Sequence, residues 1–227
     1  GQGHHWCNDN AWVATIQIAG ADKKAVCFHL RDEEGKTVFL DEEGKPALKR
    51  LARLLTKHVN KYRVAGHFFV SDLEMLVAEG FDFRKGYEVP PEDADDGTPA
   101  WKRCMRGEGG LDTAMMAHAV EETGMLGLEA VILRYTSILP YWVKVEEAIV
   151  ELCKKKGIKR AALEGYGELP RDSLIPYGNY DADGTRRAAV AILKYLDADY
   201  DGNNCWEAFW ESMIIQPVIL EIHQNGI

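Results

Sequence analysis

The chain lacks long apolar runs and paired cysteines. No apolar stretch approaches the roughly 18 residues that a membrane-spanning helix needs, and no charged leader precedes an apolar segment with a cleavage site. We therefore expect a soluble, intracellular, cytoplasmic protein with no membrane partner. The cysteines form no C-x-x-C pair, which argues against a disulfide framework or a zinc ribbon. We expect reduced, structural thiols at Cys7, Cys27, Cys104, Cys153 and Cys205.

An excess of basic residues is also missing. The formal net charge is −9, the wrong sign for a protein that grips nucleic acid through phosphate neutralisation alone. An acidic balance is compatible with carboxylates that hold divalent cations, because the metal ions then carry the positive charge that meets a phosphate. Charge alone leaves both interpretations open. The chain has 227 residues, of which 46% are hydrophobic, so it is long enough for one sizeable core.

The amino-terminal part has the pattern of a β-hairpin followed by two turns. Residues 12–18 and 25–30 are rich in apolar, aromatic and β-branched side chains, with turn-like residues between them. Residues 37–40 form a possible third strand. Residues 32–36 and 41–45 both read D-E-E-G-K, which is turn chemistry. We therefore do not expect either D-x-E to be catalytic.

Helical spacing of apolar residues dominates the remaining chain. Residues 64–70 predict a buried strand that feeds a helix over residues 72–78 through a β–α corner. Residues 87–99 are acidic and rich in proline, which predicts a loop. Together with the hairpin, these patterns predict an α/β domain. Further helices are predicted over residues 47–55, 112–123, 126–135, 145–156, 173–196, with Pro176 in the first turn, and 205–224, bent or interrupted at Pro217.

One predicted helix combines a phenol and a carboxylate at helical spacing. Tyr177 and Asp181 are four residues apart, so they share one helix face. Together they can hold a water for in-line attack on a phosphodiester. Tyr180 is a competing tyrosine, but the spacing favours Tyr177.

The segment that begins at Tyr177 reads Y-x-x-x-D-A-D-x-T and resembles the third motif of DEDDy-type 3′–5′ exonucleases, which are DnaQ-like and have an RNase H-like fold. The segment G-H-F-F-V-S-D-L-E-M-L from Gly66 is similar to their second motif, roughly G-x-N-x-x-x-D-x-x-x-L. Leu111-Asp112-Thr113 resembles the family's D-T helix start. Residues 214–227 resemble the segment that joins such an exonuclease to the polymerase body of family A DNA polymerases. The resemblance covers nearly the whole chain.

This resemblance implies a proofreading exonuclease with an RNase H-like mixed sheet flanked by helices. It would hydrolyse the last phosphodiester at a single-stranded DNA 3′ end with two Mg²⁺ or Mn²⁺ ions. Asp72 and Asp181 would bind metal, and Tyr177 would orient the attacking water. Residues 1–198 would form the exonuclease-like domain, and residues 199–227 a linker and helix toward a polymerase domain of the same polypeptide.

Nucleic-acid contacts are expected beside the two motifs and on basic helix ends. Phe68 stands where the family usually has an amide that helps to place substrate. The remaining candidates are His67, Arg186 and Arg187, with Lys154, Lys155, Lys156, Lys159 and Arg160 as further phosphate contacts.

The chain departs from the family pattern at its start. In the family, a D-x-E on the first, central strand supplies two of the four metal-binding carboxylates, and the eleven residues before Trp12 contain none. We expect that motif to lie upstream, and this chain alone to cleave DNA poorly or not at all. The alternative is a non-catalytic RNase H-like scaffold that binds DNA or supports the polymerase.

Overall fold

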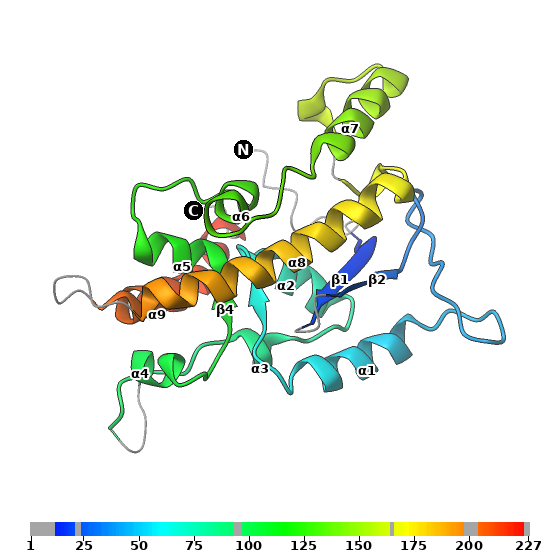
Figure 1. Ribbon diagram of the computed structural model, residues 1–227. Coiled ribbons are helices and arrows are strands. Elements are labelled where there is room, and N and C mark those ends of the chain that lie inside the picture. Colours follow the sequence, from blue (N-terminus) through cyan, green and yellow to red (C-terminus); the bar gives the residue numbers. More distant parts are fainter. Residues whose placement is uncertain (1–11, 21–23, 93–96, 164–165, 198–203, 225–227) are drawn as a thin grey trace. The chain divides into compact units, whose positions relative to one another are not determined.

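The computed structural model describes residues 12–20, 24–92, 97–163, 166–197 and 204–224 (Figure 1). Its contacts divide the chain into two units, each of which is described by itself. Within the described ranges, unit 1 comprises residues 49–136 and 185–224, and unit 2 comprises residues 12–48 and 137–184. The predicted division at residue 198 falls on residues 198–203, which lie outside the described ranges.

Unit 2 opens with the predicted hairpin. Strands β1 (Thr15–Ala19) and β2 (Ala25–His29) pair antiparallel, as the aromatic and β-branched residues indicated. The two D-E-E-G-K segments are turns, because the carboxylates of Asp32 and Asp41 accept the backbone amides of Lys36 and Lys45. The prediction of turns is confirmed.

The third strand predicted over residues 37–40 was wrong. The described residues show only isolated bridges there, between Arg31 and Thr37 and between Leu40 and Pro46. Each bridge closes one of the two aspartate turns. Two tight turns in succession leave no run of residues long enough to form a ladder with a neighbouring strand.

The core of unit 2 lies under helix α7 (Val143–Lys156). The helix ends at Gly157, whose φ of 65° is the left-handed conformation that glycine adopts readily. Short 3₁₀ turns follow at Arg160–Ala162 and Tyr166–Glu168, and then the first part of α8 (Arg171–Leu196). The buried residues of this cluster are Val145, Ile149, Cys153, Leu169 and Leu174.

In unit 1, strand β3 (Ala65–Gly66) pairs in parallel with β4 (Leu111–Asp112), and a helix follows each strand. Helix α2 spans Phe69–Ala78 and α5 spans Thr113–Val120. The β–α corner is confirmed, but the strand predicted over residues 64–70 is shorter than expected. The carboxylate of Asp112 accepts the backbone amides of Phe68 and Phe69, which ends the strand and starts the helix early.

One further helix of unit 1, α9 (Cys205–Gln224), packs against three other helices. Helix α9 contacts α2, α5 and α4 (Ala100–Met105) (Figure 1). It continues through Pro217, so of the two predicted outcomes, a bend or an interruption, the interruption is absent; buried residues such as Phe209 and Met213 fix its axis before the proline. The other helices are α1 (Leu48–Val59), α3 (Arg84–Tyr87), α6 (Leu128–Tyr135) and the second part of α8.

Several predicted helix boundaries changed, including both ends of α1 and the first residues of α6 and α7. The helix predicted over residues 112–123 begins one residue later and ends at Val120. Helix α8 begins at Arg171 rather than Ser173, which places Pro176 beyond the first turn. The predicted loop is confirmed for residues 88–92 and 97–99, and residues 93–96 lie outside the described ranges.

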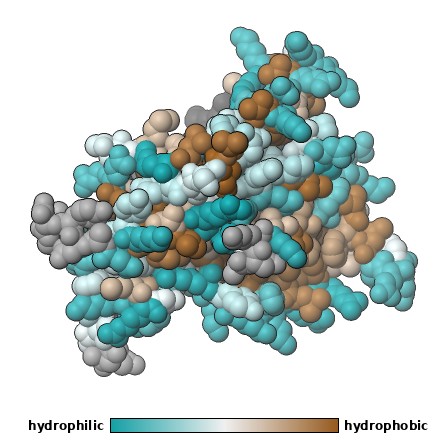
Figure 2. Space-filling view, in the orientation of Figure 1, coloured by the Kyte–Doolittle hydropathy of each residue, from teal (hydrophilic) through white to brown (hydrophobic). Residues whose placement is uncertain are grey.

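The coarse fold class is α/β, as predicted. In the described part of the chain the strands form two sheets of two strands each, β1–β2 and β3–β4. Among the same residues, no helix combines the length and apolarity needed to cross a membrane. The face shown in Figure 2 carries its hydrophobic residues in separate groups among hydrophilic ones. Cys27, Cys104, Cys153 and Cys205 are free thiols, as predicted for them.

Candidate functional site

The fully buried carboxylate of Asp112 accepts the hydrogen bonds that hold the β3–α2 corner of unit 1 together. Its side chain has 0% exposure. It accepts the backbone amides of Phe68 (3.1 Å), Phe69 (3.0 Å) and Ala114 (3.0 Å), and the hydroxyl of Tyr87 (2.7 Å). Such a set of donors compensates a buried negative charge. Asp112 therefore caps α5 and ties it to the start of α2.

The hydroxyl of Tyr87 is held in its neutral form. Burial raises its pKa, and the nearby charge of Asp112 raises it further. Tyr87 therefore remains a hydrogen-bond donor to Asp112 across the ordinary pH range. This pair is a structural contact, because both residues are buried.

Asp72 lies in the first turn of α2, and its side chain is exposed. Desolvation by neighbouring protein atoms raises the pKa of this carboxylate to about 6, and the negative charge of Asp112 acts in the same direction. A carboxylate with a raised pKa gains more than usual from a proton or a cation. Because it is also accessible, Asp72 is the candidate cation ligand of unit 1.

The side chain of His67 is packed beside this corner. The hydroxyl of Thr113 donates to the carbonyl of Gly66 (3.1 Å), so it accepts from Nδ1 of His67, which lies 2.8 Å away. Burial lowers the pKa of His67, which favours the neutral ring with its proton on Nδ1. His67 therefore fixes the corner rather than presenting a positive charge to phosphate.

In unit 2, Tyr177 and Asp181 lie on the same face of α8. Both contact Tyr141, whose hydroxyl donates to the Asp181 carboxylate and whose ring centroid is 5.8 Å from that of Tyr177. Tyr180 stacks on Tyr141 with 5.1 Å between centroids and an angle of 21°. The shared face predicted from the four-residue spacing is therefore present, and Tyr141 is its third member.

The ring of Tyr177 is fixed by its surroundings. It packs against the core of unit 2 and lies 6.0 Å from the ring of Tyr166. Asp181 is half-buried, so part of its surface remains accessible. The packed phenol of Tyr177 and the partly accessible carboxylate of Asp181 thus share one face of α8.

The basic candidates differ in accessibility. Arg186 and Arg187 lie on the part of α8 that belongs to unit 1, and both are half-buried. The candidates in the last turn of α7 and just after it are exposed in unit 2, but Lys156 pairs with Glu168 and Arg160 pairs with Glu146. These ion pairs reduce the positive charge available for phosphate.

The predicted site residues are distributed between the units. Asp72, His67 and Phe68 belong to unit 1, and Tyr177 and Asp181 belong to unit 2. In the described part of the chain, no three His, Cys, Asp or Glu side chains gather as a metal-binding group. The donors that are present, accessible carboxylate oxygens, are nevertheless the kind that Mg²⁺ and Mn²⁺ prefer.

Sequence reasoning missed two partners of this site. Asp112 was recognised as part of a D-T helix start, but its four-way clamp joins residues about 44 positions apart. Tyr141 lies between two helices, and its bond to Asp181 spans 40 positions. The sequence signal for Asp112 was an aspartate followed by a threonine at a helix start. No spacing pattern in the sequence signals the contact of Tyr141 with Asp181.

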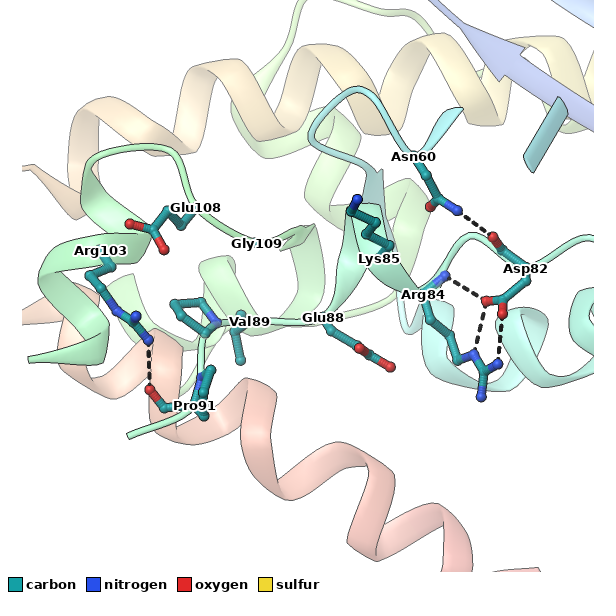
Figure 3. A pocket seen from close by; sticks show the side chains of 11 residues that line it. Asn60, Asp82, Arg84, Lys85, Glu88, Val89, Pro91, Arg103, Glu108 and Gly109 are labelled. Atoms are coloured by element: carbon teal, nitrogen blue, oxygen red, sulfur yellow. Dashed lines mark hydrogen bonds and ion pairs between the residues drawn. The ribbon is translucent and has the colours of Figure 1, made fainter. Parts of the chain in front are cut away.

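A cavity of about 650 Å³ lies elsewhere in unit 1 (Figure 3). Three of its charged side chains bind one another or the backbone. Arg84 binds both oxygens of Asp82 (2.8 and 2.6 Å), and Arg103 donates to the carbonyl of Pro91 (2.8 Å). None of the predicted site residues lines this cavity, so it adds nothing to the nuclease hypothesis.

Comparison with known proteins adds no relative. No family model, no curated protein and no solved structure matches the chain. The candidates are therefore two separate groups, each described within its own unit: the carboxylate of Asp72 in unit 1, and the Tyr141, Tyr177 and Asp181 group in unit 2.

Proposed function

We propose that this chain is a 3′–5′ exonuclease module, the proofreading part of a family A DNA polymerase with an RNase H-like fold. Its substrate is the 3′ end of single-stranded DNA. One observation carries the proposal: Tyr177 and Asp181 lie on one face of α8 and both contact Tyr141. The motif Y-x-x-x-D that begins at Tyr177 requires that shared face.

The carboxylates supply the charge that the reaction needs. In this proposal Asp72 and Asp181 hold Mg²⁺ or Mn²⁺, and a bound ion supplies the Lewis acidity that activates water and stabilises the leaving 3′ oxygen. The accessible side chain of Asp72 and its raised pKa support the assignment. A pair of cations also reconciles the net charge of −9 with a phosphate substrate.

Two aromatic residues position the reactants. The phenol of Tyr177 orients the attacking water, and its packing against the core of unit 2 keeps the hydroxyl in place. Tyr141 donates a hydrogen bond to Asp181, so one carboxylate oxygen is oriented before any cation arrives. Such preorganisation reduces the cost of assembling a site.

Two features of unit 1 support the fold assigned in this proposal. Strands β3 and β4 run parallel, and each feeds a helix directly. The segment that resembles the second motif lies at the β3–α2 corner, and the segment that resembles the D-T helix start lies at the β4–α5 corner. Their order along the chain agrees with the family pattern.

Mn²⁺ binding tests the assignment without requiring turnover. We expect Asp181→Asn to weaken Mn²⁺ binding by about tenfold or more, measured by calorimetry or electron paramagnetic resonance. The matched control is Asp183→Asn, which removes the same charge from the same helix two residues further on, on a different face. It should leave the affinity within about twofold. Identical affinity in the wild type and Asp181→Asn would refute the site.

A non-catalytic scaffold that binds DNA or supports the polymerase is the second candidate. The observation that favours it is the hydrogen bond from Tyr141, which already occupies one oxygen of Asp181. The two candidates differ in their dependence on metal. A scaffold binds single-stranded DNA equally with Ca²⁺ or with EDTA and is insensitive to Asp181→Asn. An exonuclease site binds the 3′ end more tightly with Ca²⁺ and loses that gain in the variant.

A further inference from the structure

Phe68 has an unusual backbone conformation. Among the described residues it is the one non-glycine with a positive φ, at φ 48° and ψ 37°. This left-handed region is costly for a bulky L-residue, and glycine or asparagine adopts it more readily. Strained residues of this kind persist where the surrounding structure determines them, and they cluster at functional sites.

The buried carboxylate of Asp112 holds Phe68 in this conformation. Its two oxygens accept the amides of Phe68 and Phe69, at 3.1 and 3.0 Å. The ring of Phe69 turns inward and lies 5.3 Å from that of Tyr87. Gly66 is needed for this close approach, because a Cβ at that position would lie 2.2 Å from Cβ of Phe69. The corner therefore admits little rearrangement.

The ring of Phe68 turns outward instead. It is 45% exposed, and it makes a T-shaped contact with His67, with 5.1 Å between ring centroids and an angle of 75°. A T-shaped contact covers at most one face of a ring. Phe68 thus presents an aromatic face to solvent from a fixed backbone, although burying this apolar ring would be favourable.

We propose that Phe68 is a stacking residue for an unpaired base of single-stranded DNA. The inference rests on the proposed function, because the candidate cation ligand Asp72 follows four residues later, in the first turn of the helix that Phe68 precedes. Stacking on an aromatic ring tolerates every base, since each base has a π face. This role replaces the amide contact of the family with an apolar one.

A double-mutant cycle, in which Phe68 is substituted in the protein and one base is removed from the DNA, tests the stacking contact. The chain is titrated in Ca²⁺ with a fluorescein-labelled thymidine oligonucleotide, and with versions that carry one abasic site at each of the three 3′-terminal positions. We expect one abasic position to weaken binding to the wild type by about 5- to 150-fold. The same abasic site should change binding to Phe68→Asn by less than about twofold.

The outcomes separate this inference from the proposed function. An equal abasic effect in the wild type and Phe68→Asn overturns the stacking role and leaves the nuclease proposal standing. No binding of any oligonucleotide by the wild type overturns both. Unchanged affinity of Phe68→Gly, which removes the ring without adding an amide side chain, for the intact oligonucleotide also overturns the stacking role.

Thermal stability gives an independent readout. Phe68→Asn and Phe68→Gly should raise the unfolding midpoint by about 2–4 °C, because both residues accept the left-handed conformation. The matched control is Tyr62→Asn, which removes an exposed aromatic residue of the same unit, 61% accessible and without a positive φ. Tyr62→Asn should not raise the unfolding midpoint. An abasic site should weaken DNA binding to this variant as much as it weakens binding to the wild type. A lower midpoint for both Phe68 variants would show that the residue is not held against strain.

Discussion

Two aspartates, one in each unit, accept a hydrogen bond from a tyrosine hydroxyl, yet their surroundings differ. In unit 1, Asp112 accepts from Tyr87 and from several backbone amides, and it is fully sealed. In unit 2, Asp181 accepts from Tyr141 and remains partly accessible. The comparison shows that a tyrosine–aspartate pair does not by itself mark a functional site. Access to the carboxylate separates the structural clamp from the candidate ligand.

Removal of the clamp should have the largest effect. Asp112→Ala leaves Tyr87 and the amides of Phe68 and Phe69 without their acceptor, in a region that excludes water. We expect the free energy of unfolding to fall by about 3–5 kcal/mol. Urea denaturation measures it, with Asp181→Ala as the comparison, expected to cost about 1 kcal/mol or less. Similar losses in both variants would break the distinction between the two carboxylates.

The two tyrosines should differ in the same way. Tyr87→Phe removes one donor from a buried carboxylate and should cost about 1–2 kcal/mol of stability. Tyr141→Phe should cost less than about 0.5 kcal/mol and should instead alter Mn²⁺ affinity, because Tyr141 orients Asp181. Parallel unfolding and Mn²⁺ titrations of both variants measure these effects. A change of Mn²⁺ affinity in Tyr87→Phe alone would contradict the account.

The pH dependence of Asp72 should be a smaller effect than the loss of a donor or acceptor in the buried cluster. Its pKa rises from the usual 3.8 to about 6 in the folded chain, so the native state binds the proton more tightly than the unfolded state. Ionised Asp72 therefore costs stability that grows as pH rises from about 4 to about 6. Asp72→Asn should be more stable than the wild type above pH 6, by less than about 1 kcal/mol because the side chain is exposed. The difference should vanish below pH 4.

Local patterns predicted much of the fold. The hairpin followed from apolar, β-branched and aromatic runs around a turn, and the D-E-E-G-K turns followed from aspartate and glycine at fixed positions. The longer helices followed from apolar spacing, whereas the short helices α3 and α4 were not predicted. What failed was set by distant residues: Asp112 shortened the strand before Phe68, and packing before Pro217 kept α9 intact. Local propensity carries no information about either contact.

The candidate site divides in the same way. The spacing of Tyr177 and Asp181 predicted their shared face, because an α-helix brings residues four apart together. The left-handed conformation of Phe68 was not predictable, since phenylalanine rarely adopts it and an acceptor 44 positions away imposes it. The contact between Tyr141 and Asp181 depends on the path of the chain before α7. Long-range contacts thus decide how the motif residues are presented.

Mn²⁺ affinity of two matched pairs of variants tests the nuclease assignment most directly. The site variants are Asp72→Asn and Asp181→Asn, and each has a control that removes a neighbouring acidic charge, Glu74→Gln and Asp183→Asn. We expect both site variants to bind Mn²⁺ about tenfold more weakly or worse, and both controls to bind within about twofold of the wild type. Wild-type affinity in either site variant would contradict the role of these carboxylates as cation ligands.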